Sequence, residues 1–168
     1  MKLIFFLLIL SCKSVSEYEY ISNTKDSRFK DFLKQSGENT YTNVVLKNGE
    51  FYLYKPCDLG YQQLISINVD KVTIQAGETI EYNIHDANNY NNITEYELYD
   101  SFGKGKLLMK SIDKDKTIFK LEYGNVITYY LMTPLSTAQN YTLIIHNCKE
   151  KKVEMTFDHL DLERMWNK

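Results

Sequence analysis

The sequence has no excess of basic residues and no long apolar run. Lysine and arginine number 20 against 22 acidic residues, so the net charge is −2. Binding to a phosphate backbone needs a basic surface, and we therefore expect no nucleic-acid partner. The apolar run from Leu3 to Leu10 is much shorter than the about 20 residues that a membrane-spanning helix needs. This run is therefore not predicted to be a transmembrane anchor.

The same apolar run matches the hydrophobic region of an export signal. It follows Met1 and the basic Lys2, and it ends at Ser11-Cys12. Signal regions of this kind have a positive start followed by about 7–15 apolar residues. The alternatives to an export signal that ends at a lipidated cysteine are an ordinary signal peptide and a buried first strand.

The four residues Ile9-Leu10-Ser11-Cys12 resemble the bacterial lipobox, a branched apolar residue and a small residue before the cysteine that is lipidated. The resemblance implies that residues 1–11 are a lipoprotein signal peptide and that Cys12 carries the acyl chains. Leu10 is bulkier than the residue usual at its position. Several acyl chains anchor a protein stably to a bilayer. The resemblance therefore implies a lipid-anchored protein of the bacterial cell envelope, facing the periplasm or the cell exterior.

The remaining chain divides into a short polar segment and one domain. Residues 12–25 are mostly polar and are predicted to be a tether, in which Tyr18, Tyr20 and Ile21 are the residues best suited to dock on the domain. Residues 26–168 have a length typical of one domain. We therefore expect a single β-rich domain over 26–168.

Cys57 and Cys148 are the cysteines that remain once Cys12 is lipidated. An even number of cysteines in an oxidising compartment favours a disulfide. The alternative is two buried free thiols. We predict the Cys57–Cys148 disulfide.

The pattern of the body indicates mostly strands. The chain has 14 tyrosines and 2 prolines, and tyrosine favours strands. Phe29, Phe32 and Leu33 share one face of a predicted short helix over 26–35, which Asp26 or Ser27 can cap. Asn48-Gly49 is typical of a hairpin turn between strands over 41–47 and 50–55. Further strands are predicted over 64–69, 72–75, 79–84, 93–99, 106–109, 117–123, 126–132, 141–146 and 151–157, and a helical turn over 158–166. This spacing predicts a mainly β, antiparallel sandwich or jelly-roll-like domain, with a short helix near each end.

Three segments resemble bacterial pre-peptidase C-terminal domains. Val72 to Ile84 resembles their early strands, Leu98 to Gly103 resembles a Leu-Tyr-Asp-x-x-Gly turn, and Tyr141 to Ile145 resembles their closing strand. Glu95-Tyr96-Glu97 stands where the family has Asp-Leu-Asp, so the resemblance implies no calcium site. It covers about residues 70–146 and implies a β-sandwich binding fold without catalytic residues.

The sequence offers few residues for catalysis or for a cofactor. It has no Gly-x-Ser-x-Gly motif, and its three histidines are not at a metal-ligand spacing. His159, Asp161 and Glu163 could gather at a metal, but a helix cap at Asp158 explains the acidic residues equally well. Glu95 and Glu97 lie on one face of a predicted strand, either as a hydrolytic carboxylate pair or as a solvated outer face. We assign no catalytic, cofactor-binding or metal-binding residue.

The surplus of tyrosines is the remaining functional signal. Tyr52 and Tyr54 share a predicted strand face, and Tyr129 belongs to a later strand; exposed tyrosines stack on sugars and enter protein interfaces. The alternative is that they fill half-buried sheet positions. We predict a non-catalytic binding module for a protein, such as a toxin or hydrolase, or for a glycan. The alternatives are a small envelope hydrolase that uses Glu95 and Glu97, and a structural subunit of an envelope assembly.

Overall fold

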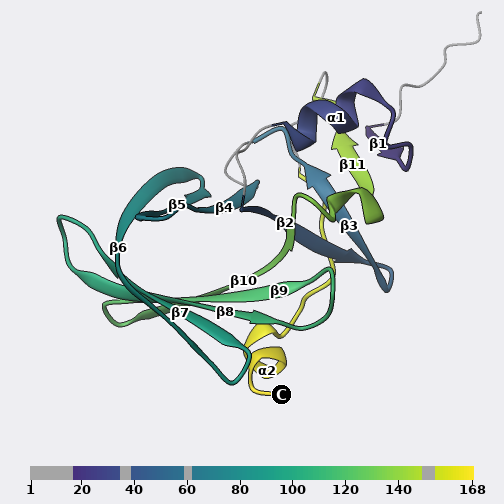
Figure 1. Cartoon of the computed structure of the whole chain (residues 1–168). Helices are drawn as coiled ribbons and strands as arrows, with labels where there is room; N and C mark the ends of the chain where they lie inside the picture. The colour runs from purple at the N-terminus through teal and green to yellow at the C-terminus, as the bar shows by residue number, and fades with distance from the viewer. Residues whose placement is uncertain (1–16, 35–38, 59–61, 149–153) are drawn as a thin grey trace, which may run out of the picture.

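The computed structural model describes residues 17–34, 39–58, 62–148 and 154–168 (Figure 1). Cys12 and the predicted signal peptide lie outside these residues. In the described part, no helix is both long and apolar enough to cross a membrane. The elements are β1 (Tyr18–Ile21), α1 (Ser27–Leu33), β2 (Thr40–Lys47), β3 (Glu50–Lys55), β4 (Gln63–Ile67), β5 (Lys71–Ala76), β6 (Glu78–Tyr90), β7 (Ile93–Tyr99), β8 (Lys104–Ser111), β9 (Thr117–Tyr123), β10 (Val126–Pro134), a 3-10 turn (Ala138–Asn140), β11 (Thr142–His146) and α2 (Leu162–Trp166).

Eight of the strands form a closed ring of pairings. Strands β4 to β10 pair in chain order, each antiparallel to the next, and β2 pairs with both β10 and β4. The ring is flattened: β4 and β5 face β7, β8 and β9 across the interior, and β6 curves from one layer to the other (Figure 1). The prediction of a mainly β, sandwich-like domain is therefore confirmed. Its two layers are continuous where β6 curves.

A small second sheet extends from the ring. β2 leaves the ring after Asn43, and its last residues, from Val44 to Lys47, pair with β3. β3 then pairs with β11, and β11 pairs with β1. The β3–β11 pair is parallel, whereas the sequence pattern predicted only antiparallel strands. A parallel pair needs a long crossover, which the ring itself provides here.

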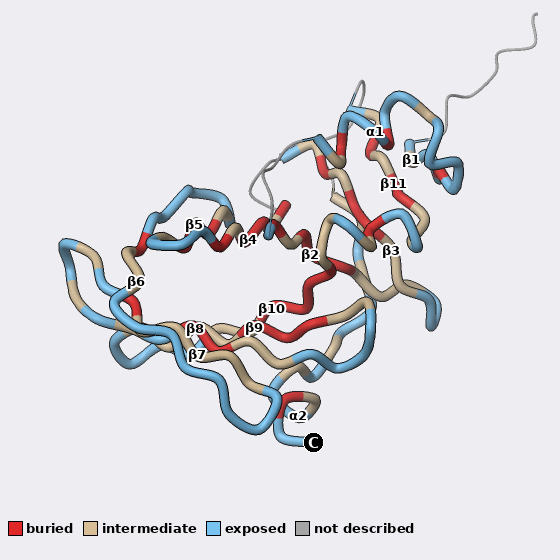
Figure 2. The backbone as a smooth tube through the Cα atoms, in the orientation of Figure 1, coloured by how far each residue is buried: buried red, intermediate tan, exposed pale blue. Residues whose placement is uncertain are grey.

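Two apolar cores result from this arrangement. The inner core fills the ring and includes Val72, Leu107, Phe119 and Met132, which have no exposed surface. The second core lies between the small sheet, α1, α2 and the outer faces of β8 to β10. Side chains alternate between the two faces of a strand, so β8 to β10 contribute to both cores. Figure 2 shows the buried stretches of β2, β9 and β10 where the ring meets the small sheet.

The sequence pattern predicted the turn between β2 and β3 and the cap of α1 correctly. Asn48 and Gly49 have φ angles of 52° and 82°, as the predicted hairpin turn requires. Asp26 caps α1 through a hydrogen bond of 2.9 Å from the backbone N–H of Arg28. β6 runs to Tyr90, past its predicted end at residue 84. The turn between β6 and β7 therefore consists only of Asn91 and Asn92, which also have positive φ angles.

Other local predictions were wrong or incomplete. The described part of the predicted strand over 151–157, Glu154 to Phe157, is not a strand. Phe157 packs on Tyr54, and the N–H of Asp158 donates to the Leu46 carbonyl of β2 at 2.8 Å, but no ladder of pairings forms. Residues 18–21 of the predicted tether form β1, paired with β11. In α2 the capping side chain is Asp161 and not the predicted Asp158; it accepts from the backbone N–H of Arg164 at 2.9 Å.

Candidate functional site

The predicted disulfide joins the ends of two parallel strands. Cys57 follows β3 and Cys148 follows β11, and these strands are in register, with Ile145 opposite Lys55. The two cysteines are bonded, and their Cα atoms lie 5.6 Å apart. The prediction that Cys57 and Cys148 pair is therefore confirmed at the level of their geometry. The bond holds together strands that are separated in the sequence by β4 to β10.

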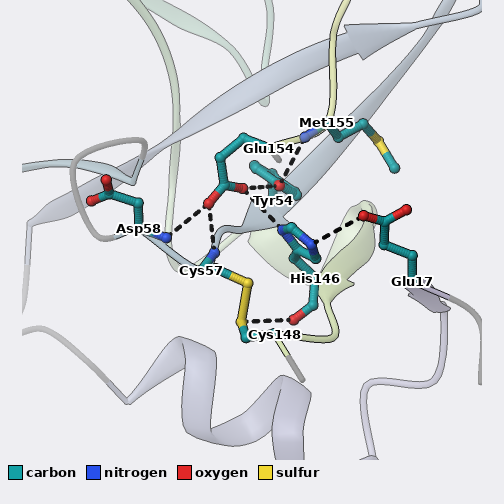
Figure 3. The surroundings of a disulfide bond; sticks show 8 residues. All are labelled: Glu17, Tyr54, Cys57, Asp58, His146, Cys148, Glu154 and Met155. Carbon is teal, nitrogen blue, oxygen red and sulfur yellow. Dashed lines mark hydrogen bonds and ion pairs between the residues drawn. A yellow bond between two sulfur atoms is a disulfide. The ribbon is translucent and has the colours of Figure 1, made fainter. Parts of the chain in front are cut away.

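Beside this disulfide, Glu154, Tyr54, His146 and the backbone of Cys57 and Asp58 form a hydrogen-bonded cluster, which we call the Glu154 cluster (Figure 3). The Glu154 carboxylate accepts hydrogen bonds from the Tyr54 hydroxyl, from the backbone N–H of Cys57 at 3.0 Å and from that of Asp58 at 2.8 Å. Its other neighbour is His146 Nδ1, at 3.2 Å. The Glu154 side chain is only 8% exposed. The carboxylate therefore ties the C-terminal segment to the ends of β3 and β11.

The electrostatics of the cluster favour an ionised Glu154. Burial by itself raises the pKa of this carboxyl, but the hydrogen bonds from Tyr54, the Asp58 backbone and His146 outweigh burial and leave the pKa below its usual value. The pKa of the Tyr54 phenol is raised, first by burial and then by its bond to Glu154. The pair is therefore a neutral phenol that donates to a charged acceptor, which is a strong hydrogen bond.

His146 connects this cluster to the start of the described chain. Its ring is buried, and within the described residues its Nε2 atom makes no hydrogen bond. The nearest acidic group on that side is Glu17, whose Oε1 lies 3.8 Å away. The ring of Tyr18 packs against the imidazole, with 4.7 Å between the ring centres. The cluster therefore also fixes the edge strand β1 to β11.

Cys57, His146 and Glu154 bring three potential metal-ligand atoms within 4.8 Å of one another. A cysteine binds a metal as the thiolate, and the Cys57 sulfur is bonded to Cys148 instead. The carboxylate already accepts several hydrogen bonds. We therefore interpret the Glu154 cluster as structural. The sequence analysis missed it, because Glu154 is about 100 residues from Tyr54 in the chain and no local pattern joins the two.

The three tyrosines that the sequence selected do not form one surface. Tyr54 is 2% exposed and is covered by the C-terminal segment, where Phe157 packs edge-on at 4.9 Å. It is therefore unavailable to a partner. Tyr52 is half-buried, bonds to Glu50 at 2.7 Å and packs edge-on against Tyr20.

Tyr129 is a residue of β10 and lies against α2. It is half-buried, and its ring centre is 6.4 Å from that of Trp166. Trp166 is 9% exposed and is therefore a packed side chain. Tyr129 therefore takes part in docking α2 on β10.

An open pocket lies on the outer face of β6, β7 and β8, and we call it the outer pocket. It has a volume of about 700 Å³. Tyr99 and Phe102 form its aromatic part; they are 42% and 91% exposed. Its polar side chains include His85, Glu97, Lys104 and Lys106. None of these aromatic residues was selected from the sequence, although the Leu-Tyr-Asp-x-x-Gly pattern marked the turn that holds them.

A β-bulge brings His85 to this pocket. The pairing of β6 with β7 shifts between Ile84 and Asp86, so His85 is the extra residue of the bulged strand. The His85 ring packs edge-on against Tyr99, with 6.3 Å between the ring centres. Bulges of this kind redirect side chains and are common beside functional sites.

The turn that carries Phe102 is rigidly built. Asp100 accepts hydrogen bonds from the backbone N–H groups of Phe102 and Gly103, at 2.7 and 2.9 Å, and from the Tyr123 hydroxyl. These bonds, that of Tyr123 first, lower the pKa of Asp100. At Gly105, a Cβ atom would lie 2.6 Å from the Tyr123 ring and 2.6 Å from a backbone oxygen. Glycine there lets Tyr123 pack under the turn, so Phe102 is held outward.

The predicted carboxylate pair beside this pocket is not arranged as an acid and a base. Glu95 accepts from Lys106 and from the Tyr90 hydroxyl, both at 2.6 Å. These two bonds lower the pKa of Glu95, with Lys106 as the larger cause. A glycosidase needs one carboxyl with a raised pKa as its general acid. Glu97 lies opposite Lys106 in the sheet register, so both carboxylates face an ammonium group.

No family model, no curated protein and no solved structure matches this chain. The lipobox at Cys12 and the resemblance to pre-peptidase C-terminal domains therefore stay predictions from the residues. Any function proposed for the chain has to be argued from its own side chains and their geometry.

Proposed function

We propose that this chain is a lipid-anchored protein of the cell envelope, acting as a non-catalytic module that binds a glycan in the outer pocket. The observation that supports this most is the concave site in which Tyr99 and Phe102 expose their rings beside charged side chains. Aromatic side chains offer a large apolar face at a wet surface. That combination suits a sugar ring, which has an apolar face and polar edges.

The polar lining complements the aromatic part. Glu97 provides acceptors, Lys104 and Lys106 provide donors, and His85 adds a ring nitrogen. The pocket volume of about 700 Å³ falls within the about 300–1,000 Å³ of usual ligand sites. One or two sugar units therefore fit without a change in the fold.

The position of the pocket also suits an anchored receptor. β1 and α1 lie at one side of the molecule, while β6 lies at the other (Figure 1). Under the lipobox interpretation, the lipid precedes β1 in the chain. The outer pocket is then on the side that faces away from the bilayer, where an extracellular or periplasmic glycan is accessible.

Glycan binding is tested with the chain from residue 12 onward, which retains every described residue, on an array of bacterial and host glycans. We expect Tyr99→Ala and Phe102→Ala each to weaken binding about tenfold, since about 1.4 kcal/mol corresponds to a factor of ten and an aromatic contact contributes that order. Tyr20→Ala removes a tyrosine of similar exposure, 50%, on β1 and is expected to leave binding unchanged. Capture of a protein through Tyr99 and Phe102, with no glycan bound, would contradict the glycan assignment.

The anchor makes a separate prediction. In a bacterial host fed labelled palmitate, the wild-type chain is expected to incorporate label and to fractionate with membranes. Cys12→Ala removes the acyl acceptor, so the label should disappear and the protein should leave the membrane fraction. A Cys57→Ala, Cys148→Ala double variant is the matched control and should keep its label. Label on the Cys12→Ala chain would show that the lipobox interpretation is wrong.

A further inference from the structure

The ring of strands is packed at its middle but hollow at one mouth. Its central inward side chains, such as Val72, Leu107 and Phe119, have no exposed surface. At the mouth, Tyr41 and Tyr96 belong to the same inner cluster but are only half-buried. The space beside them is a cavity of about 380 Å³, which we call the mouth cavity. It is separate from the outer pocket, which lies outside the ring.

The bulge in β6 helps to open this cavity. Ile84 and Ala87, on either side of the bulge, both line the mouth cavity, whereas His85 lines the outer pocket. Ala87 lies directly opposite Tyr96 in the pairing of β6 with β7. A methyl group at this position leaves space that a larger side chain would fill. The small residue and the bulge therefore keep the mouth open.

The rim of the cavity is held by backbone hydrogen bonds. The N–H of Ile67 donates to the Asn39 carbonyl at 3.1 Å, and the N–H of Ile84 donates to the Asp70 carbonyl at 2.8 Å. The turn between β4 and β5 is thereby tied to β2 on one side and to β6 on the other. A cavity that exists before its ligand arrives avoids the free-energy cost of ordering the site.

The cavity presents two phenol groups to a ligand. Both side chains line the cavity, and burial raises the pKa of both phenols. Neither hydroxyl has a hydrogen-bond partner in the part of the chain that the structure describes. A half-buried polar group without a partner is favourable only when water or a ligand bonds to it.

The lining carries no charged side chain: besides Tyr41 and Tyr96, it consists of apolar residues and two asparagines. An anionic or cationic ligand would therefore leave its charge unpaired. A closed sheet of about eight strands is just wide enough to hold one small ligand. We infer that the mouth cavity binds one small, uncharged amphipathic molecule, with its polar group on the Tyr41 and Tyr96 hydroxyls. This site is independent of the proposed glycan site.

A matched pair of fluorescent probes tests the inference on the chain from residue 12 onward. N-phenyl-1-naphthylamine is uncharged and has one N–H donor, whereas 1-anilinonaphthalene-8-sulfonate has nearly the same ring system with an added negative charge. We expect the uncharged probe to bind saturably at one site per chain and the sulfonated probe to bind at least about tenfold more weakly, because a buried unpaired charge is costly. No saturable binding of the uncharged probe, or equal binding of both probes, would overturn the inference.

Variants then locate the bound probe. Ala87→Phe fills the mouth and should weaken binding of the uncharged probe at least about tenfold, while Ala76→Phe, at the end of β5, should leave it unchanged. The Tyr41→Phe, Tyr96→Phe double variant keeps the shape and removes both hydroxyls, so it should weaken binding about three- to tenfold even if Ala87→Phe fails to fold. Wild-type affinity in the double variant, or in a folded Ala87→Phe protein, would reject the site. Tyr99→Ala alters only the outer pocket and should not affect the probe, so the two sites fail or succeed separately.

Discussion

A Cys57→Ser, Cys148→Ser double variant is expected to have a free energy of unfolding about 4 kcal/mol lower than that of the wild type. The disulfide closes a loop with a sequence separation of 91 residues, and a closure of that length restricts the unfolded chain by roughly 4–5 kcal/mol in the loop-entropy model. Urea unfolding followed by circular dichroism measures the difference. The effect should be large because the bond joins β3 to β11 and so closes a long loop in the unfolded chain.

A dithiol reductant provides the control for this experiment. It should destabilise the wild type by a similar amount and leave the double variant unchanged, because that variant has no bond to reduce. Equal stability of the wild type with and without reductant would show that the bond does not stabilise the fold. Quantitative alkylation of both thiols in the untreated protein would show that it does not form.

Glu154→Gln is expected to lower the free energy of unfolding by about 3 kcal/mol. The carboxylate accepts from the Tyr54 hydroxyl and from the backbone of Cys57 and Asp58. The amide keeps the shape but has one acceptor oxygen and turns two donors toward other donors. A buried donor left without a partner costs about 1–3 kcal/mol, and bonds to a charged acceptor contribute more than neutral ones. The same urea unfolding experiment measures the loss.

The matched control is Glu81→Gln on the ring surface. The side chain of Glu81 is 61% exposed and pairs with Lys71 at 3.4 Å, so its replacement should change stability by less than about 0.5 kcal/mol. If Glu154→Gln were as mild as Glu81→Gln, the Glu154 cluster would not be the structural anchor that we describe.

The difference between the wild type and Glu154→Gln should also depend on pH. The pKa of Glu154 is lowered in the folded state, so its ionised form contributes stability above the unfolded-state value of about 4.3. That contribution is lost as the pH falls through the lower folded pKa. The gap between the two proteins should therefore be constant from about pH 6 to 8 and should narrow below about pH 4.

The sequence predicts some residues of the Glu154 cluster and its disulfide but not others. The cysteine pair could be predicted, because two cysteines remain once Cys12 is assigned to the predicted lipid anchor. Glu154 could not, because its partners Tyr54 and His146 come from two other strands. Tyr54 was expected on a binding face from its alternation with Tyr52. Only the packing of the C-terminal segment, with Phe157 on the Tyr54 ring, shows that this face is covered.

The aromatic residues of the outer pocket were missed for a related reason. Tyr99, at the end of β7, and Phe102, in the turn that follows, are exposed. The sequence by itself does not show whether an aromatic residue at such a position is exposed or buried. The bulge at His85 is a shift in pairing between two strands, and it depends on the partner strand as much as on its own residues. The turn itself could be located, since Asp100 and Gly103 are typical turn residues.

The sequence alone determined the local features of this protein: the alternation that makes strands, the Asn48-Gly49 turn, the Asp26 cap of α1 and the identity of the paired cysteines. The strands, the turn and the cap depend on neighbouring residues, whose conformational preferences act over a few positions, whereas the cysteine pair followed from the number of cysteines. Only the tertiary structure decided the closure of the ring by β2, the parallel pairing of β3 with β11, the burial of Tyr54 and the hollow mouth beside Tyr96. Each of these depends on contacts between residues far apart in the chain, which no local pattern encodes.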